Sequence, residues 1–304
     1  MSDGRHRASS DHSAPRSVVR GVRKFFRASR HREPAQGAGI QFALSDSGVG
    51  NKITYPDTWE AHNFSITIRG DNNSVSFAEG SRLSDCDIVV NGDHNSIEVG
   101  ASSLDRVQVT CRGGVANRLV IGDGCIIRQL TVDFPDSNGE VSIGSRTTIH
   151  GKTDLAPTEG RRISVGDDCL FGSDICLWTS DWHSILDLQG NRVNPPQDIS
   201  IGNHVWVCSF ATILKGVSIP DNCVVAMHSV VTRRFERPHC VIGGNPAAII
   251  RADIDWHLHM LPWEDNTAKE PEPDQRLPLL VELPGAAADP TPASTPPEAF
   301  DDLG

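Results

Sequence analysis

One polar segment, residues 179–198, carries the side chains of this chain that are best suited to chemistry. It contains His183 between Trp182 and Ser184, with Asp181 two residues before the histidine. An imidazole has a pKa near neutral, so it can remove a proton from a hydroxyl group at physiological pH. The segment falls on no repeat and contains two prolines, which indicates a loop, and loops on a rigid body commonly hold functional residues. His183 is therefore a candidate general base in a projecting loop, although a lone histidine in a loop is more often simply solvated.

The body that must position this loop is predicted by a repeat with a period of 22 residues. Five short apolar-x-apolar strands open at the same step, at Val75, Ile97, Leu119, Val141 and Ile163. Alternation points one set of side chains inward, and one coil buries this face only when others stack on it. Turn residues keep the same step, and we expect them at corners that need positive φ: Gly70, Gly92, Gly114, Asn73, Asn95 and Asn117. The pattern predicts an all-β parallel solenoid over residues 36–251.

The step of the repeat changes where the loop occurs. The strand at Ile199 follows Ile163 by 36 residues, and the next strand, at Val217, lies only 18 residues further on. Eighteen residues correspond to three hexapeptides, one for each side of a triangular coil. The extra residues between Ile163 and Ile199 include the polar segment, which supports its projection from the body.

Residues 163–251 carry a family resemblance. The segments Ser180-Asp-Trp-His-Ser-Ile185 and Arg192-Val-Asn-Pro195, the run from residue 199 to 217, and the ending Ser229-Val-Val-Thr-Arg233 with residues 243–251 together resemble the hexapeptide-repeat acetyltransferases. The most similar members are O-acetyltransferases of capsular and other surface polysaccharides. The resemblance implies a left-handed parallel β-helix and a homotrimer with active sites between subunits. The residues alone leave the hand of the N-terminal 22-residue coils open.

The resemblance also implies a mechanism and a set of site residues. His183 would deprotonate an acceptor hydroxyl, which attacks acetyl-CoA directly, without an acyl-enzyme, while backbone N–H groups stabilise the oxyanion. Acetyl-CoA is the implied co-substrate, and its predicted contacts are Ala211, Thr212, Lys215, Ser229, Val230, Arg233 and Arg251. Arginine suits the phosphates of coenzyme A because of its bidentate geometry. The predicted contacts of a sugar acceptor are Asp181, Trp182, Asn194 and Trp206.

Other reactive side chains are interpreted as structural. His204 is expected to pack or hydrogen-bond at a coil corner, whereas His228 replaces a glycine of the family. Cys208 and Phe210 are bulkier than the family's residues, and we expect them to narrow the coenzyme A tunnel. The histidines lack the spacing of a three-histidine zinc site, so no metal is predicted. The eight cysteines lie singly and are interpreted as free, buried thiols of a reducing cytoplasm.

The two ends of the chain differ from the body in charge. Residues 1–35 hold nine Arg/Lys against three acidic residues, and residues 252–304 hold twelve Asp/Glu against two basic ones, within a net charge of −11. Residues 17–30 fit a basic amphipathic helix at the inner face of a membrane, a solvated tail or a cap on the first coil. Residues 252–304 are predicted to form a short segment and a disordered acidic, proline-rich tail. The acidic core argues against nucleic-acid binding.

Three functions from different classes follow from these observations. The first is an acetyl-CoA-dependent O-acetyltransferase acting on a sugar hydroxyl of a glycan or polysaccharide precursor. The second is an N-acyltransferase acting on a nucleotide-linked amino sugar. The third is a β-helix scaffold without catalysis, which the residues at Cys208, Phe210 and His228 favour. The expected location is the cytoplasm, at the inner face of the membrane if residues 17–30 bind it.

Overall fold

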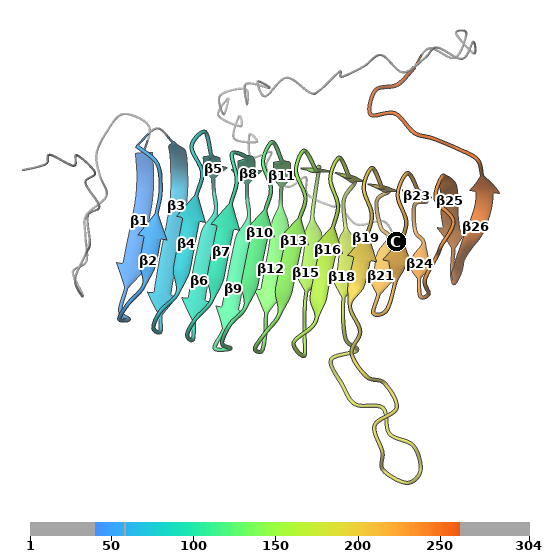
Figure 1. Cartoon of the computed structure of the whole chain (residues 1–304), viewed down its shortest axis with the longest axis horizontal. Coiled ribbons are helices and arrows are strands. Elements are labelled where there is room, and N and C mark those ends of the chain that lie inside the picture. Colours follow the sequence, from blue (N-terminus) through green and yellow to red (C-terminus); the bar gives the residue numbers. More distant parts are fainter. Residues whose placement is uncertain (1–39, 58, 262–304) are drawn as a thin grey trace, which may run out of the picture.

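The computed structural model describes residues 40–57 and 59–261. Within these ranges the chain forms 26 strands and no helix, wound into a solenoid of about nine turns (Figure 1). Every strand pairing is parallel except that of the last two strands. The predicted all-β parallel solenoid is therefore confirmed, whereas the basic arm and most of the acidic tail lie outside the described residues. No helix that could span a membrane occurs in the described part.

The strands form three columns that run along the solenoid. The first column is an eight-stranded sheet made of β2 (Lys52–Thr54), β4 (Ser74–Phe77), β7 (Ser96–Val99), β10 (Arg118–Ile121), β13 (Glu140–Ile143), β16 (Arg162–Val165), β19 (Ile199–Ile201) and β22 (Ser218–Ile219). The second column is made of β5 (Arg82–Ser84), β8 (Ser103–Asp105), β11 (Ile126–Arg128), β14 (Thr148–Ile149), β17 (Leu170–Phe171), β20 (Trp206–Val207), β23 (Val224–Val225) and β25 (Cys240–Gly244).

The third column carries the face from which the loop departs. Its members are β6 (Asp87–Asn91), β9 (Gln108–Arg112), β12 (Leu130–Phe134), β15 (Thr153–Ala156), β18 (Ile175–Trp178), β21 (Thr212–Leu214) and β24 (Val230–Val231). At the N-terminal end β1 (Ile40–Asp46) pairs with β3 (Glu60–Arg69), which is long enough to pair with both β5 and β6. At the other end β26 (Ala247–Ala252) pairs antiparallel with β25.

The predicted register of the repeat is confirmed strand by strand. Val75 pairs with Ile97, and the series continues through Leu119, Val141 and Ile163 at steps of 22 residues. Ile163 then pairs with Ile199, which spans the loop, and the following coil is 18 residues long. All of these side chains are at most 1% exposed. Each buried aliphatic side chain stabilises the stack by about 1.5–3 kcal/mol.

The asparagines that keep the 22-residue step form a buried ladder. The side-chain oxygen of Asn73 accepts the backbone N–H of Asn95 at 2.8 Å, and that of Asn95 accepts the N–H of Asn117 at 3.0 Å. Positive φ is found one residue earlier, at Asn72, His94 and Ala116. The prediction of positive φ at the periodic asparagines is wrong, because their side chains satisfy backbone groups that a buried corner would otherwise leave unpaired.

A glycine is required at the corner of the second coil. Gly92 has a φ of +102°, and a Cβ atom built on it would lie 2.2 Å from the carbonyl oxygen of Gly114 in the next coil. A side chain at this position would clash with backbone, which has no room to move. The glycine step of the repeat thus follows from the close approach of successive coils.

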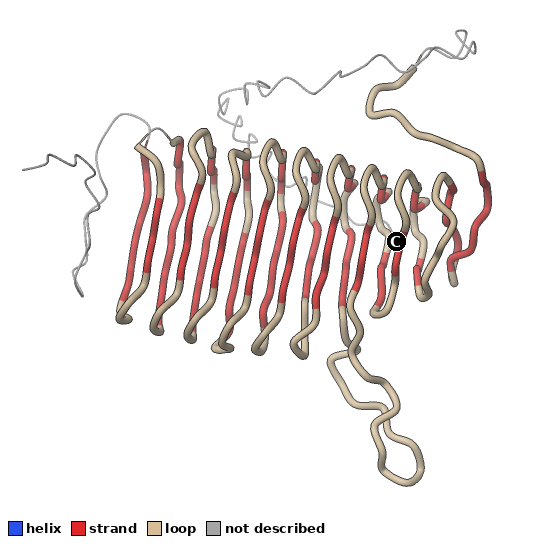
Figure 2. Tube along the Cα trace, viewed as in Figure 1, coloured by secondary structure: helices blue, strands red, loops and turns tan. Residues whose placement is uncertain are grey.

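The third column becomes shorter toward the C-terminus. Its strands hold five residues each from β6 to β12, four in β15 and β18, three in β21 and two in β24. Residues 179–198 leave the body between β18 and β19 and project well beyond the coils (Figure 2). The loop predicted from the sequence is therefore confirmed, and it departs where the face contracts.

Candidate functional site

The base of the projecting loop is buried and tied to the preceding coil. Thr179 and Ser180, directly after β18, are 0% and 4% exposed. The Thr179 hydroxyl accepts the backbone N–H of Thr158 at 2.8 Å and donates to the carbonyl oxygens of Ala156 or Thr158 at 3.3 and 3.1 Å. These bonds fix the point at which the loop leaves the solenoid.

A charged clamp holds the returning arm of the loop. The Arg192 guanidinium donates two hydrogen bonds to the Glu159 carboxylate, at 2.5 and 2.8 Å, and the Ser180 hydroxyl donates a third at 2.5 Å. These donors, Arg192 foremost, lower the pKa of Glu159 to about 2. Glu159 therefore stays ionised at physiological pH and joins both arms of the loop to the turn after β15.

Asn194 lies at the centre of the loop and is only 7% exposed. Its amide nitrogen donates to the Asp181 carboxylate at 2.7 Å and to the carbonyl oxygen of His183 at 2.8 Å. Its amide oxygen accepts the backbone N–H of Ile185 at 2.8 Å and Nε of Arg192 at 3.2 Å. These four bonds match both N–H donors and both lone pairs of an amide, so the side chain is fully engaged within the loop.

An ion pair joins the loop to the next coil of the third column. The Lys215 ammonium, just after β21, donates to the Asp181 carboxylate. This hydrogen bond, with a smaller contribution from Asn194, lowers the pKa of Asp181. The structure thus brings three predicted site residues, Asp181, Asn194 and Lys215, into one hydrogen-bonded cluster.

His183 is held by its backbone and presents an exposed side chain. Its N–H donates to the Asp181 carbonyl oxygen at 2.7 Å, and Asn194 binds its own carbonyl oxygen. The preceding residue, Trp182, adopts a φ of +62°, a left-handed conformation that costs roughly 1–2 kcal/mol for a side chain other than glycine. Within the described residues the His183 ring receives no hydrogen bond. The tight turn therefore presents an exposed imidazole to which no hydrogen bond comes from the described residues.

The residues predicted to bind coenzyme A fall on two successive coils. Thr212 pairs with Val230, and both side chains are half-buried on the outer surface of the third column. Ala211 and Ser229 precede them and are fully buried at 0% exposure, so only their backbone groups can reach a ligand. The Thr212 N–H already donates to the Ser229 carbonyl oxygen at 2.9 Å.

Three other predicted site residues lie apart from the loop cluster in this chain. Trp206 belongs to β20 in the second column, where its ring lies 5.9 Å from that of Trp256. Arg233 lies over the ring of Phe235 at 5.3 Å, and Arg251 is on β26 at the C-terminal end of the solenoid. All three side chains are exposed.

The structural interpretation of the corner residues is partly tested by their contacts. His204 stacks on Trp256 with ring centres 4.2 Å apart and makes a 3.1 Å hydrogen bond with the Trp256 carbonyl oxygen, which confirms its predicted packing at a corner. Phe210 and His228 both have positive φ and stack on each other at 4.7 Å. The stack leaves both rings exposed at the coil edge. All eight cysteines are free, and six of them are buried.

The sequence reasoning missed several residues at this site. Glu159 and Ser180 anchor the loop, and Trp178, Asp154 and Asp133 line a groove beside it. The last three occupy outward positions of strands, where the repeat shows no apolar signal. The residues that alternate with the apolar positions of each strand point outward, and listing them would have placed these three on the column from which the loop departs.

Comparison with known proteins finds relatives that are named acetyltransferases. No protein-family model matches the chain. A polysialic acid O-acetyltransferase of Escherichia coli O1:K1 / APEC is 34% identical over 118 residues, which are 38% of each chain. A polysialic acid O-acetyltransferase of Neisseria meningitidis is 30% identical over 138 residues, 44% of this chain and 64% of that protein. The chain thus spans less than two thirds of these curated relatives.

A solved structure covers more of the chain. The polysialic acid O-acetyltransferase OatWY is similar with a TM-score of 0.56 and 32% sequence identity. The similarity extends over 74% of this chain and 96% of that one. A match of this extent is longer than the segment that carries the family motifs, so it reaches into the 22-residue coils.

Proposed function

The chain belongs to the hexapeptide-repeat acetyltransferases, and we propose that it transfers an acetyl group from acetyl-CoA to a hydroxyl group of a glycan. The observation that carries this proposal is the turn at His183. Asn194 and the Asp181–Lys215 pair fix that turn against the coil whose outer face carries Thr212. Base-catalysed acyl transfer needs an accessible imidazole next to the surface that binds the acetyl donor, and this arrangement provides both.

Side chains on the coils that follow the loop fit acetyl-CoA as the donor. Thr212 and Val230 offer a half-buried strip on adjacent coils, and Lys215 lies at the edge of the same strip. Arg233 and Arg251 are exposed cations toward the C-terminal end, and they would hold the phosphates. When bound, acetyl-CoA supplies an activated acetyl thioester.

The chain's own part in the reaction is to move one proton. His183 takes the proton of the acceptor hydroxyl at an imidazole nitrogen, which makes the oxygen nucleophilic. Asp181 keeps its charge beside Lys215 and accepts hydrogen bonds from acceptor hydroxyls. Asn194 acts as a positioning residue, because its amide has no donor or acceptor left for a substrate. Cys176 is in register with Thr212, and burial raises the pKa of its thiol. A protonated thiol is a poor nucleophile, which favours direct transfer of the acetyl group from acetyl-CoA to the acceptor over transfer through an acyl-cysteine.

The proposed activity is tested by following coenzyme A release with a panel of glycans. We expect release to require a glycan and His183→Ala to lower kcat by about 10²–10⁴-fold. His62→Ala, which replaces an exposed histidine on β3, is the matched control and keeps full activity. The product should lose its acetyl group in mild base, as esters do; a base-stable product would identify an amide and overturn O-acetylation. Release that is unchanged in His183→Ala would remove the base from the mechanism.

We also propose that the loop docks on another copy of the chain, as the implied homotrimer requires. Four apolar side chains of the loop are more than half exposed in the single chain: Ile185, Leu186, Leu188 and Val193. Leu188, at the far end of the loop, is fully exposed. Clustered apolar side chains of this kind are usually covered by a partner surface. A neighbouring subunit would then enclose the exposed His183 ring.

A further inference from the structure

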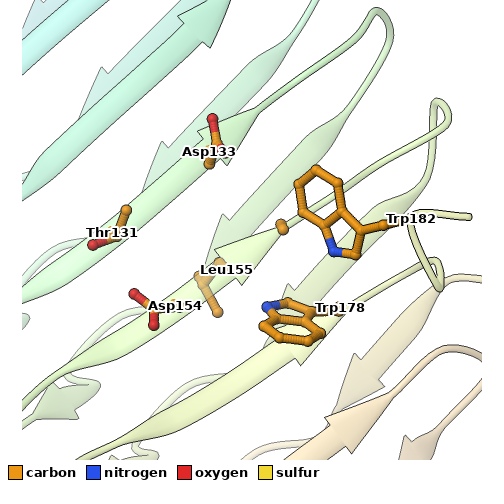
Figure 3. Close-up of a pocket in the computed structure, with 7 residues that line it drawn as sticks. Thr131, Asp133, Asp154, Leu155, Trp178 and Trp182 are labelled. Atoms are coloured by element: carbon orange, nitrogen blue, oxygen red, sulfur yellow. The ribbon is translucent and has the colours of Figure 1, made fainter.

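A groove of about 340 Å³ lies beside the base of the loop, on the third column. Thr131 and Asp133 reach it from β12, Asp154 from β15 and Trp178 from β18. Trp182 reaches it from the loop, next to His183. Figure 3 shows these side chains on one side of the sheet, with the two indole rings close together.

The hollow follows from the register of the strands. Ala156 of β15 is in register with Trp178 of β18. On the outer face of the third column, a small methyl side chain therefore lies next to the large indole. The groove is also lined by the buried residues Ala156 and Leu155, beside Trp178 and Trp182, which are 37% and 46% exposed. Two exposed indoles around a small residue leave a slot with an aromatic side.

The carboxylates of the groove are held in fixed positions. Asp133 receives two hydrogen bonds from Arg112, at 2.7 and 2.8 Å, and its side chain is only 17% exposed. Asp154 lies 3.6 Å from the Lys152 ammonium. Among the described residues, the seven that line the groove include no lysine or arginine, and neither of these two cations is one of them. These residues therefore offer the groove oriented acceptors for hydroxyl groups.

The groove and the predicted acetyl-CoA contacts lie on the same face of the solenoid, on opposite sides of the loop. Thr131 pairs with Asp154, and Cys176 pairs with Thr212, which pairs in turn with Val230. The loop that carries His183 leaves the same face after β18. A glycan in the groove would thus approach His183 from the N-terminal coils, while the donor approaches from the C-terminal coils.

We propose that this groove binds an uncharged pyranose unit of the acceptor glycan, adjacent to the unit that receives the acetyl group. The proposal rests on the proposed transferase function, and it deepens it by naming the chemical class of the acceptor. The apolar side of the sugar ring stacks on Trp178 or Trp182, and its hydroxyl groups donate to Asp133 and Asp154. A sialic acid unit would bring a carboxylate near these two carboxylates. Like charges at about 4 Å repel by about 1 kcal/mol in water, and the paired cations Arg112 and Lys152 reduce this repulsion. The chain is therefore expected to prefer neutral glycans to polysialic acid, the acceptor named for its relatives.

Two groove variants test the proposal in the full-length chain. Trp178→Ala and Asp154→Asn should each raise the acceptor KM about tenfold, as truncation of a central contact commonly does, while the acetyl-CoA KM stays unchanged. Tyr55→Ala is the matched control, because Tyr55 is an exposed aromatic residue of the first coil at 45% exposure. The probes are neutral trisaccharides of glucose, galactose and N-acetylglucosamine, and a trimer of sialic acid.

A binding arm without turnover separates this proposal from the transferase. The same probes are titrated onto His183→Ala, with and without Trp178→Ala, and tryptophan fluorescence is followed. Binding of a neutral probe that is lost in the double variant supports the groove even if no probe is acetylated. Turnover with unchanged acceptor KM in both groove variants overturns the groove and leaves the transferase standing. Equal or better use of the sialic acid trimer also overturns it, as does the absence of binding by every neutral probe.

Discussion

The side chain of Asn194 should matter for catalysis without contacting the substrate. It makes four hydrogen bonds in a site that is 7% exposed, and two of them fix the backbone on either side of the catalytic turn, at the His183 carbonyl oxygen and the Ile185 N–H. Asn194→Ala removes these bonds and leaves both backbone groups without that partner. A net hydrogen bond contributes about 1 kcal/mol, so the two bonds contribute about 2 kcal/mol to the ordered turn.

That free energy sets the expected size of the effect. A loss of about 2 kcal/mol lowers the equilibrium constant for the ordered turn by roughly 30-fold, and kcat falls by up to the same factor. The melting temperature should change little, because the loop opens locally while the stacked coils stay intact. Asn191→Ala is the matched control: Asn191 is an exposed asparagine of the same loop whose side chain bonds only to Asp187.

The assay is steady-state coenzyme A release at varied acceptor and acetyl-CoA concentrations, with a thermal melt of each variant. The positioning role requires a fall in kcat with both KM values near those of the native chain. A rise in acceptor KM alone would refute it and would restore the substrate contact that the sequence predicts for Asn194. A kcat within threefold of the native value would refute the reasoning from hydrogen bonds altogether.

Three further predictions concern stability, pH and assembly. Leu119→Ala, in the fully buried first column, should lower the free energy of unfolding by about 2–5 kcal/mol in denaturant melts, and a loss below 1 kcal/mol would contradict a close-packed stack. Because the folded pKa of Glu159 is about 2, its contribution to stability should be complete above pH 4.5 and disappear as the pH falls toward 2. The melting difference between Glu159→Gln and the native chain should therefore shrink only over that window, and a difference that shrinks above pH 5 speaks against the clamp. Leu188→Glu at the loop tip should lower the mass measured by light scattering, and an unchanged mass excludes the tip from the contact between copies.

The repeat could be predicted because each inward residue packs against the equivalent residue of the adjacent coil. Each residue of the series from Val75 to Ile163 stacks on a residue of the same kind one period away, so the period alone specifies the contact. The loop could be predicted for the opposite reason, because residues 179–198 interrupt that step. Both predictions need only the period of the sequence, and both are confirmed by the structure.

The relations between faces could not be predicted in this way. Trp206 follows the loop of Asp181 by only one strand, β19, but it lies on the second column, and the corners of the coil that separate the two residues are not marked by the period. The role of Asn194 depends on how the two arms of the loop meet, which the bonds of Glu159 to Arg192 and Ser180 determine. Such contacts join residues 21 and 33 positions apart and leave no periodic trace.

The loop explains why a site arises at this place on the solenoid. The 22-residue coils give the third column strands of four or five residues, whereas the 18-residue coil after the loop gives β21 only three. The shortening lies at the start of β21, because Trp178, the last residue of β18, is in register with Leu214, the last residue of β21. A flat face of stacked strands has no hollow, because each outward side chain is flanked by similar neighbours. Here the loop interrupts that face directly after Trp178, and Lys215, just after β21, holds the loop against the next coil through Asp181. A base on the loop then has the groove on one side and the coil of Thr212 on the other, which suits a reaction between two unlike substrates.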